Sequence, residues 1–193
     1  TSQAHDEARH FYVLHDYLQA LPFTPQPLNR QTRLLLDGVL LTDNPLHKVM
    51  GMQLMIEALA LTIFQAIRES QAEPVLCELL RYFEKDEARH VGLGVQYLPT
   101  QLRGLSRWQE RRMIAFQVQL LAAALLELKA LEPHMRLLGI DPRQVYLLGT
   151  AKQALVFEML WKEQGTTDQE EESLASRLLT ATGELLFPEP QPG

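Results

Sequence analysis

The chain has 193 residues and is 46% hydrophobic, which predicts one globular domain with a buried core. Its net charge of −6 at pH 7 disfavours a nucleic-acid partner, because phosphates are bound by basic surfaces. The single cysteine, Cys77, excludes disulfides within the chain and a cysteine-based metal cage. No run of about 18 apolar residues is free of charge and no signal peptide is visible, so we expect a cytoplasmic protein without a membrane span.

Helical periodicity and the positions of proline divide the chain into predicted helices, and no strand pattern interrupts them. These all-α elements cover residues 3–21, 31–41, 46–70, 71–98, 106–138, 142–164 and 168–186. Pro22 and Pro99 are expected to follow the ends of the first and fourth helices, because proline disrupts a helix interior. The third helix is apolar almost all round, which predicts a central, buried position.

One five-residue word occurs twice in the chain. Asp6-Glu7-Ala8-Arg9-His10 recurs letter for letter as Asp86-Glu87-Ala88-Arg89-His90. A glutamate and a histidine three residues apart project from the same face of a helix. Both words lie on the apolar stripes of their helices, so each of the two helices directs one carboxylate and one imidazole toward the interior. Such a repeat favours a shared site over two solvated helix surfaces.

Glu57 is the only charged residue between Val49 and Phe64, in the middle of the apolar third helix. A lone buried carboxylate is costly, so Glu57 needs either an arginine from one of the two words or a metal ion. Carboxylates can bridge two ions while each imidazole binds one of them, and this set of ligands suits iron or manganese. The two words and Glu57 therefore favour a di-metal site.

The spacing of these features predicts one further ligand. Glu57 precedes Glu87 by 30 residues, about one antiparallel helix hairpin, and the two words lie 80 residues apart, as if a helix pair had been duplicated. The symmetry predicts a fourth glutamate upstream of residue 1, on a first core helix missing from the given sequence. If another residue takes that place, Glu158 is the internal candidate, and Glu84 is a weaker candidate for an additional ligand.

Residues 1–98 resemble the ferritin-like di-iron carboxylate superfamily, in which two helices supply one Glu each and two others supply Glu-x-x-His. The closest likeness is to the O2-activating branches (desaturases, monooxygenases and arylamine N-oxygenases), which share a Glu followed by Asp-Glu-x-x-His. Here these residues are Glu57 and Asp86–His90. The resemblance implies two iron ions, or a manganese–iron pair, with the ligands Glu7, His10, Glu57, Glu87 and His90.

The resemblance also implies residues that support the ligands. Asp6 would orient His90 and Asp86 would orient His10, since a ligating imidazole commonly donates its other N–H to a carboxylate. Arg9 and Arg89 would neutralise these two aspartates. Some family features are absent: Leu14 stands where reductase subunits carry a radical tyrosine, and Phe83 where the N-oxygenases carry an additional histidine.

By the same resemblance, the function would be that of a non-haem di-iron oxidase or oxygenase that uses O2 to oxidise a small organic substrate. Apolar side chains on the ligand faces would line a pocket for an apolar substrate: Phe11, Leu14, Leu18, Leu80 and Phe83. We predict no catalytic side chain beyond the ligands, and an external electron-donor protein, since no flavin or iron–sulfur motif is present. Two alternatives stay open: an iron-handling ferroxidase, and a non-enzymatic helical scaffold with a degenerate site.

The predicted organisation is a single ferritin-like helical bundle over residues 1–187 with a tail at 188–193. Residues 1–98 would hold the metal-binding core helices and residues 106–187 the additional C-terminal helices. These accessory helices have enough apolar surface to cover the bundle or to form a homodimer interface.

Overall fold

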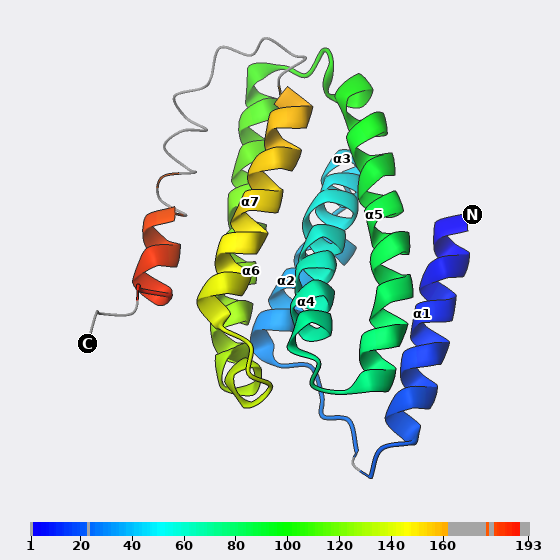
Figure 1. Ribbon diagram of the computed structural model, residues 1–193. Helices are drawn as coiled ribbons and strands as arrows, with labels where there is room; N and C mark the ends of the chain where they lie inside the picture. Colours follow the sequence, from blue (N-terminus) through cyan, green and yellow to red (C-terminus); the bar gives the residue numbers. More distant parts are fainter. Residues whose placement is uncertain (1, 23, 162–176, 178–179, 190–193) are drawn as a thin grey trace.

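The computed structural model describes residues 2–22, 24–161, 177 and 180–189, and all the secondary structure in these ranges is helical (Figure 1). Side chains are described up to residue 155 and again at 177 and 180–189. The helices are α1 (Ser2–Gln19), α2 (Arg30–Leu40), α3 (Pro45–Val49), a π-helix η1 (Met50–Ile56), α4 (Glu57–Ser70), α5 (Pro74–Leu102), α6 (Arg107–Leu137) and α7 (Pro142–Trp161). The predicted all-α fold is therefore confirmed for the described residues.

Several helix ends follow directly from the local sequence. Asn44 precedes Pro45 and accepts hydrogen bonds from the backbone N–H groups of Leu46 and His47, which caps α3. Ser106 begins α6 with a capping box. Gln71 ends α4 in the left-handed conformation with φ 54°. Because the chain turns there, the next helix begins at Pro74 and not at residue 71 as predicted.

The prediction that Pro99 ends the fourth helix is wrong, because α5 continues through Pro99 to Leu102. Proline removes one donor from a helix interior and usually disrupts it. Here Leu98 and Leu102 are both fully buried in a core cluster that includes Met50. Burying two leucines contributes about 3–6 kcal/mol, which is enough to offset the helical defect at Pro99.

The predicted helix 46–70 is present but contains a π-helix that the sequence pattern did not reveal. In η1 the backbone hydrogen bonds widen, so the N–H of Glu57 reaches the carbonyl of Met52, five residues back. Such widened turns are rare and are frequently found at functional sites. This one ends immediately before Glu57, the residue singled out by its isolation in an apolar stretch.

The helices are arranged around α4, which contacts both α5 and α7 (Figure 1). α1 lies at one edge of the molecule against α5, and α6 packs against α2 and α7 on the other side of α4. Three core clusters fill the interior, and their buried members include Met50, Leu54 and Met113 in the first, Tyr146 and Phe187 in the second, and Val39 and Phe116 in the third. The predicted central position of the third helix is thus confirmed.

Two helical stretches, Pro45–Ser70 and Arg107–Leu137, are long and apolar enough to span a membrane by length and composition. The same properties are typical of the core helices of globular proteins, so they are weak evidence for a membrane location. Of the predicted helix 168–186, the structure describes residue 177 and residues 180–186, which are helical, and the remainder lies outside the described residues. Phe187, just beyond it, stacks on Tyr146 of α7.

Candidate metal centre

The two copies of the repeated word meet at the contact between α1 and α5. Nδ1 of His10 lies 3.3 Å from Oε1 of Glu87 and 3.7 Å from Oε2 of Glu7. Nδ1 of His90 lies 3.1 Å from Oε2 of Glu87 and 3.2 Å from Oε1 of Glu7. Each glutamate therefore presents one oxygen to each imidazole, an arrangement that can place two carboxylates across a pair of metal ions.

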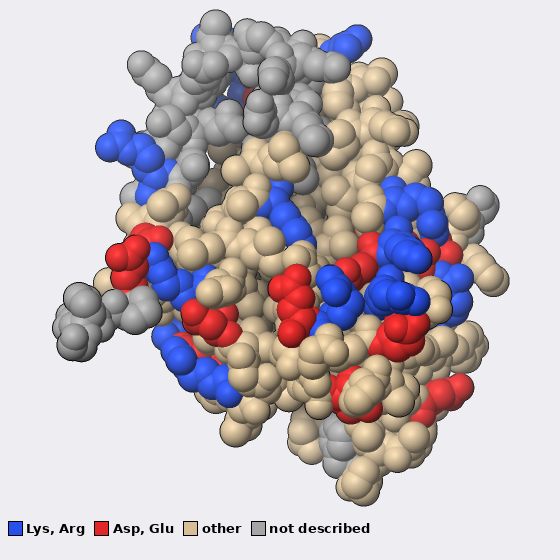
Figure 2. Space-filling view, viewed as in Figure 1, with Lys and Arg blue, Asp and Glu red and all other residues tan. Residues whose placement is uncertain are grey.

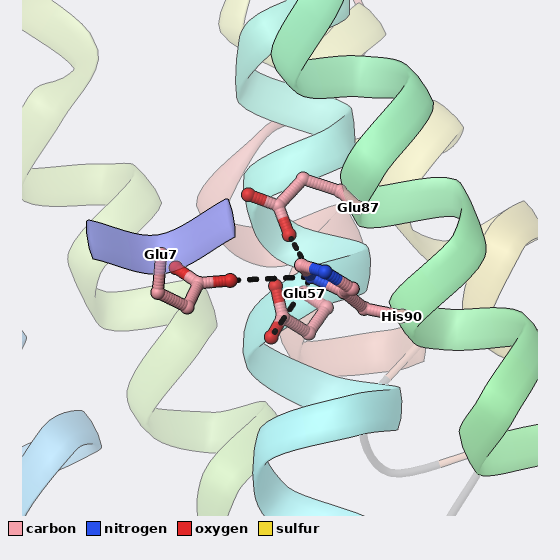
Figure 3. A group of neighbouring side chains, drawn as sticks. All are labelled: Glu7, Glu57, Glu87 and His90. Atoms are coloured by element: carbon pink, nitrogen blue, oxygen red, sulfur yellow. Dashed lines mark hydrogen bonds and ion pairs between the residues drawn. The ribbon is translucent and has the colours of Figure 1, made fainter. Parts of the chain in front are cut away.

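Glu57 completes the group from the start of α4, with Oε1 3.8 Å from Nδ1 of His90 (Figure 3). One oxygen each from Glu7, Glu57 and Glu87 and one ring nitrogen of His90 lie within 4.8 Å of one another. The group is deeply placed: Glu57, Glu87 and His90 are all buried, whereas nearly half of the Glu7 side chain is exposed. All five predicted ligands are thus brought together, with His10 on the far side of the two shared glutamates.

The two aspartates of the repeated word contact the histidine of the opposite helix, as the family resemblance implied. Nε2 of His10 lies 3.1 Å from Oδ2 of Asp86, and Nε2 of His90 lies 3.3 Å from Oδ2 of Asp6. A hydrogen bond donated from Nε2 leaves Nδ1 facing the glutamates, where it can donate to Glu87 in the metal-free protein and could bind a metal ion once it has lost that proton. The aspartates therefore fix the tautomer in which each imidazole can bind a metal ion through Nδ1.

Both arginines of the repeated word bind these aspartates, and among the described residues neither forms an ion pair with a glutamate of the site. Arg89 donates to Asp6 at 2.7 Å and to Asp86 at 2.8 Å, and Arg9 donates to Asp6 at 3.2 Å and also to Asp86. Half of each arginine side chain is exposed, so this network closes the site toward the surface. Figure 2 shows that cationic and acidic side chains are interleaved on one face of the molecule.

The glutamates share a buried space that is unfavourable for several negative charges. Burial, together with a hydrogen bond to Glu87 and the charges of Glu87 and Glu7, raises the pKa of Glu57 to about 9. Burial also raises the pKa of Glu87, but hydrogen bonds from His10 and Glu57 outweigh it and leave that pKa lowered. In the metal-free protein Glu57 thus holds a proton that it donates to the ionised Glu87.

The pKa values of the two aspartates are lowered, and that of His10 is raised. The hydrogen bond from Arg89 lowers the pKa of Asp6. Burial raises the pKa of Asp86, but hydrogen bonds from His10 and Arg89 outweigh it and lower the pKa. Burial lowers the pKa of His10, yet hydrogen bonds to Glu87 and Asp86 raise it overall. Both aspartates are therefore held ionised, as the acceptors of imidazole N–H groups must be.

The predicted pocket residues differ in burial. Leu80 and Phe83 are buried, and the Phe83 ring packs against the His10 ring with centroids 4.2 Å apart. Leu14 and Leu18 are half-buried. The prediction for Phe11 is wrong: it is 65% exposed and stacks on His15 along the outer surface of α1. Phe11 follows His10 directly, and one residue turns a helix by about 100°, which carries Phe11 away from the site.

Glu84, considered from the sequence as an additional ligand, does not join the group. Glu84 accepts a hydrogen bond from Arg68 at 2.8 Å, and it pairs with that residue on the side of α5 facing α4. The side chain of Glu158 lies outside the described residues.

Sequence reasoning missed two glutamines that reach the site. Nε2 of Gln3 donates to Oε1 of Glu57 at 2.9 Å, and Nε2 of Gln53 donates to Oε1 of Gln3 at 2.9 Å. A signal was present, because each glutamine lies four residues before a predicted ligand, Glu7 and Glu57 respectively. That spacing places both glutamines on the ligand faces of their helices.

The chain matches none of the protein families, curated proteins or solved structures with which it was compared. The description of this centre therefore depends on its own geometry: three glutamates and two histidines gathered at one point between α1, α4 and α5.

Proposed function

We propose that the protein binds two iron or manganese ions at this centre, in a ferritin-like arrangement of α1, α4 and α5, and uses them with O2 to oxidise a small organic substrate. One observation carries the proposal: Glu7 and Glu87 each present one oxygen to Nδ1 of His10 and the other to Nδ1 of His90. Glu7, Glu87, His10 and His90 would together hold the two ions.

The set of ligands also fits cations for an electrostatic reason. Within the described residues, the ion pairs formed by Glu7, Glu57 and Glu87 are all with His10 or His90. Both neighbouring arginines are engaged by Asp6 and Asp86. Three clustered carboxylates are costly in a buried space unless positive charge balances them. Two divalent ions would provide that charge, and carboxylate with imidazole is a donor set that iron and manganese accept.

Bound iron or manganese would supply the redox chemistry for O2 activation. The protein's own residues would perform the remaining tasks. Asp6 and Asp86 hold the Nε2 protons and keep each Nδ1 available for metal binding. The buried Phe83 provides an apolar, water-excluding wall beside His10, and Leu80, which precedes it by three residues on α5, is buried as well, which favours an apolar substrate. The electrons would come from an external donor protein.

Oxygen consumption by the iron-loaded protein tests this function. The protein is loaded with Fe²⁺ without oxygen and then mixed with O2 in the presence of short fatty acyl or aromatic compounds. An oxygenase consumes O2 in proportion to product, which mass spectrometry detects with label from ¹⁸O2. Repeated oxidation of added Fe²⁺ with growth of a mineral particle would instead support the iron-handling alternative. Metal binding without reaction toward O2 would favour the non-enzymatic scaffold.

A further inference from the structure

The two positions at which metal ions would bind have different surroundings, although the repeated word makes their ligands alike. In the 80-residue repeat, Gln3 of α1 corresponds to Phe83 of α5, since each lies four residues before the glutamate of its word. Phe83 packs its ring against His10. Gln3 instead hydrogen-bonds Glu57, whose carboxylate lies next to His90.

The hydrogen bonds around Gln3 form a chain with a fixed direction. Nε2 of Gln3 donates to Oε1 of Glu57. A Glu57 that binds a metal ion would be ionised and could only accept hydrogen bonds, so the same orientation of Gln3 would serve the metal-bound state. The Gln3 carbonyl then faces Gln53 and accepts from the NH₂ group of that side chain. The chain ends at Oε1 of Gln53, which is buried and has no hydrogen-bond partner among the described residues. Leaving a buried acceptor unpaired is unfavourable, so hydrogen bonding between these two half-buried amides does not by itself explain the arrangement.

The π-helix and a glycine bring Gln53 into this position. Gln53 lies in η1, whose widened turns lead into Glu57. On the neighbouring helix α5, a Cβ atom added at Gly94 would lie 2.7 Å from Cβ of Gln53 and 2.8 Å from Cδ2 of Leu54. Only glycine therefore allows η1 to approach α5 this closely. The approach places Gln53 between α5 and Gln3, so that α1, η1 and α4 are joined through two amides and one carboxylate.

We propose that Gln3, supported by Gln53, is a positioning residue that holds the Glu57 carboxylate as a ligand of the metal ion bound at His90. The inference depends on the proposed metal site and adds a specific asymmetry to it. The ion at His90 gains a ligand anchored through α1 and η1, while the ion at His10 lies beside the apolar ring of Phe83. Hydrogen bonds that orient a ligating carboxylate typically change metal affinity by about 10–100-fold when they are removed.

The test is a titration of the purified chain with Co²⁺, whose visible absorption reports ligand number and geometry. Gln3→Met keeps the length and helix propensity of glutamine but cannot donate a hydrogen bond. We expect Gln3→Met to lower the affinity for one of the two ions by about 10–100-fold and to leave the affinity for the other within about twofold of the wild-type value. Gln19→Met, on the exposed far end of α1, is the matched control and should bind both ions as the wild type does.

Anomalous scattering from crystals of Gln3→Met grown with limiting Co²⁺ identifies which ion is bound less tightly. We expect it to be the ion at His90. Gln53→Met leaves α1 intact and should weaken the same ion to a smaller extent. If Gln3→Met bound each of the two ions with the same affinity as the wild type does, this inference would be overturned while the metal site stayed in place. Weakening at His10 would overturn it as well. A wild-type chain that binds no Co²⁺ would overturn the proposed function, and the inference with it.

Discussion

The same five residues lie in very different surroundings in α1 and in α5. Four percent of the Glu87 side chain is exposed, against 46% of the Glu7 side chain. α5 buries ten residues between its neighbours, whereas α1 buries only Asp6 and His10. The pKa values do not follow exposure alone: burial and the nearby Glu87 raise the pKa of Glu7, while hydrogen bonds from His10 and Glu57 lower the pKa of the more deeply buried Glu87. Helix geometry thus reproduces the ligand directions, and tertiary packing determines how each ligand is solvated.

Aromatic residues near the two words should show the largest contrast in stability. Phe83 of α5 is 3% exposed and packs against His10 and Phe64, whereas Phe11 of α1 is 65% exposed. Phe83→Ala should lower the free energy of unfolding by about 3–5 kcal/mol, because it leaves a cavity in the core. Phe11→Ala should change it by less than about 0.5 kcal/mol. Urea denaturation of both variants measures this, and a loss of more than about 2 kcal/mol in Phe11→Ala would show that the outer surface of α1 is packed.

The aspartates should behave alike in spite of the different surroundings, because each orients the histidine of the other helix. Asp6→Asn and Asp86→Asn should each weaken metal binding by about 10–100-fold. Asp16→Asn, on the exposed surface of α1, is the control and should leave the affinity unchanged. Metal titration by calorimetry checks all three. An unchanged affinity in either of the first two variants would mean that its Asp–His contact does not set the imidazole orientation.

The protonated Glu57 makes the stability of the metal-free protein depend on pH. Its pKa is raised to about 9 in the folded protein, so between the ordinary glutamate value and pH 9 the folded state binds more protons than the unfolded state. The stability from this group is complete at low pH and is lost as pH rises through that window. Glu57→Gln removes the effect and should stabilise the metal-free protein by roughly 1–3 kcal/mol at pH 8.5 relative to wild type.

Denaturation at pH 5 and pH 8.5 in the presence of a chelator checks this prediction. Glu69→Gln, on the exposed side of the same helix, is the matched control. If Glu57→Gln lowered the free energy of unfolding relative to wild type by the same amount at pH 8.5 and at pH 5, the Glu57 carboxyl would already be ionised in the metal-free protein. The proton shared with Glu87 would then not exist.

The arginines should have the smallest effects. Arg9 and Arg89 are half exposed, and each aspartate keeps one arginine when the other is removed. Arg9→Ala and Arg89→Ala should therefore each lower the free energy of unfolding by about 1 kcal/mol or less, and less still at high salt. Thermal unfolding at two ionic strengths measures this. A much larger loss in the double variant than in the two single variants together would show that the arginines substitute for one another.

Much of this organisation was predictable from the sequence, because it depends on local spacing. The Glu-x-x-His spacing fixes which side chains share a helix face, and the exact repeat at Asp6–His10 and Asp86–His90 indicates a shared site. The π-helix before Glu57 and the helical path through Pro99 were not predictable, since both depend on contacts with other helices. The exposure of Phe11 was missed because an apolar residue next to a ligand fits a broad stripe in the sequence.

The metal content of the purified protein tests the central claim most directly. Wild-type protein, equilibrated with Fe²⁺ or Mn²⁺ and freed of excess ions, should retain about two ions per chain by elemental analysis. Glu87→Ala removes the carboxylate that faces both imidazoles and should retain almost none, while Glu78→Ala, exposed on the same helix, should retain as much as the wild type. A wild-type chain without bound metal, or a Glu87→Ala variant that binds as well as the wild type, would contradict the account.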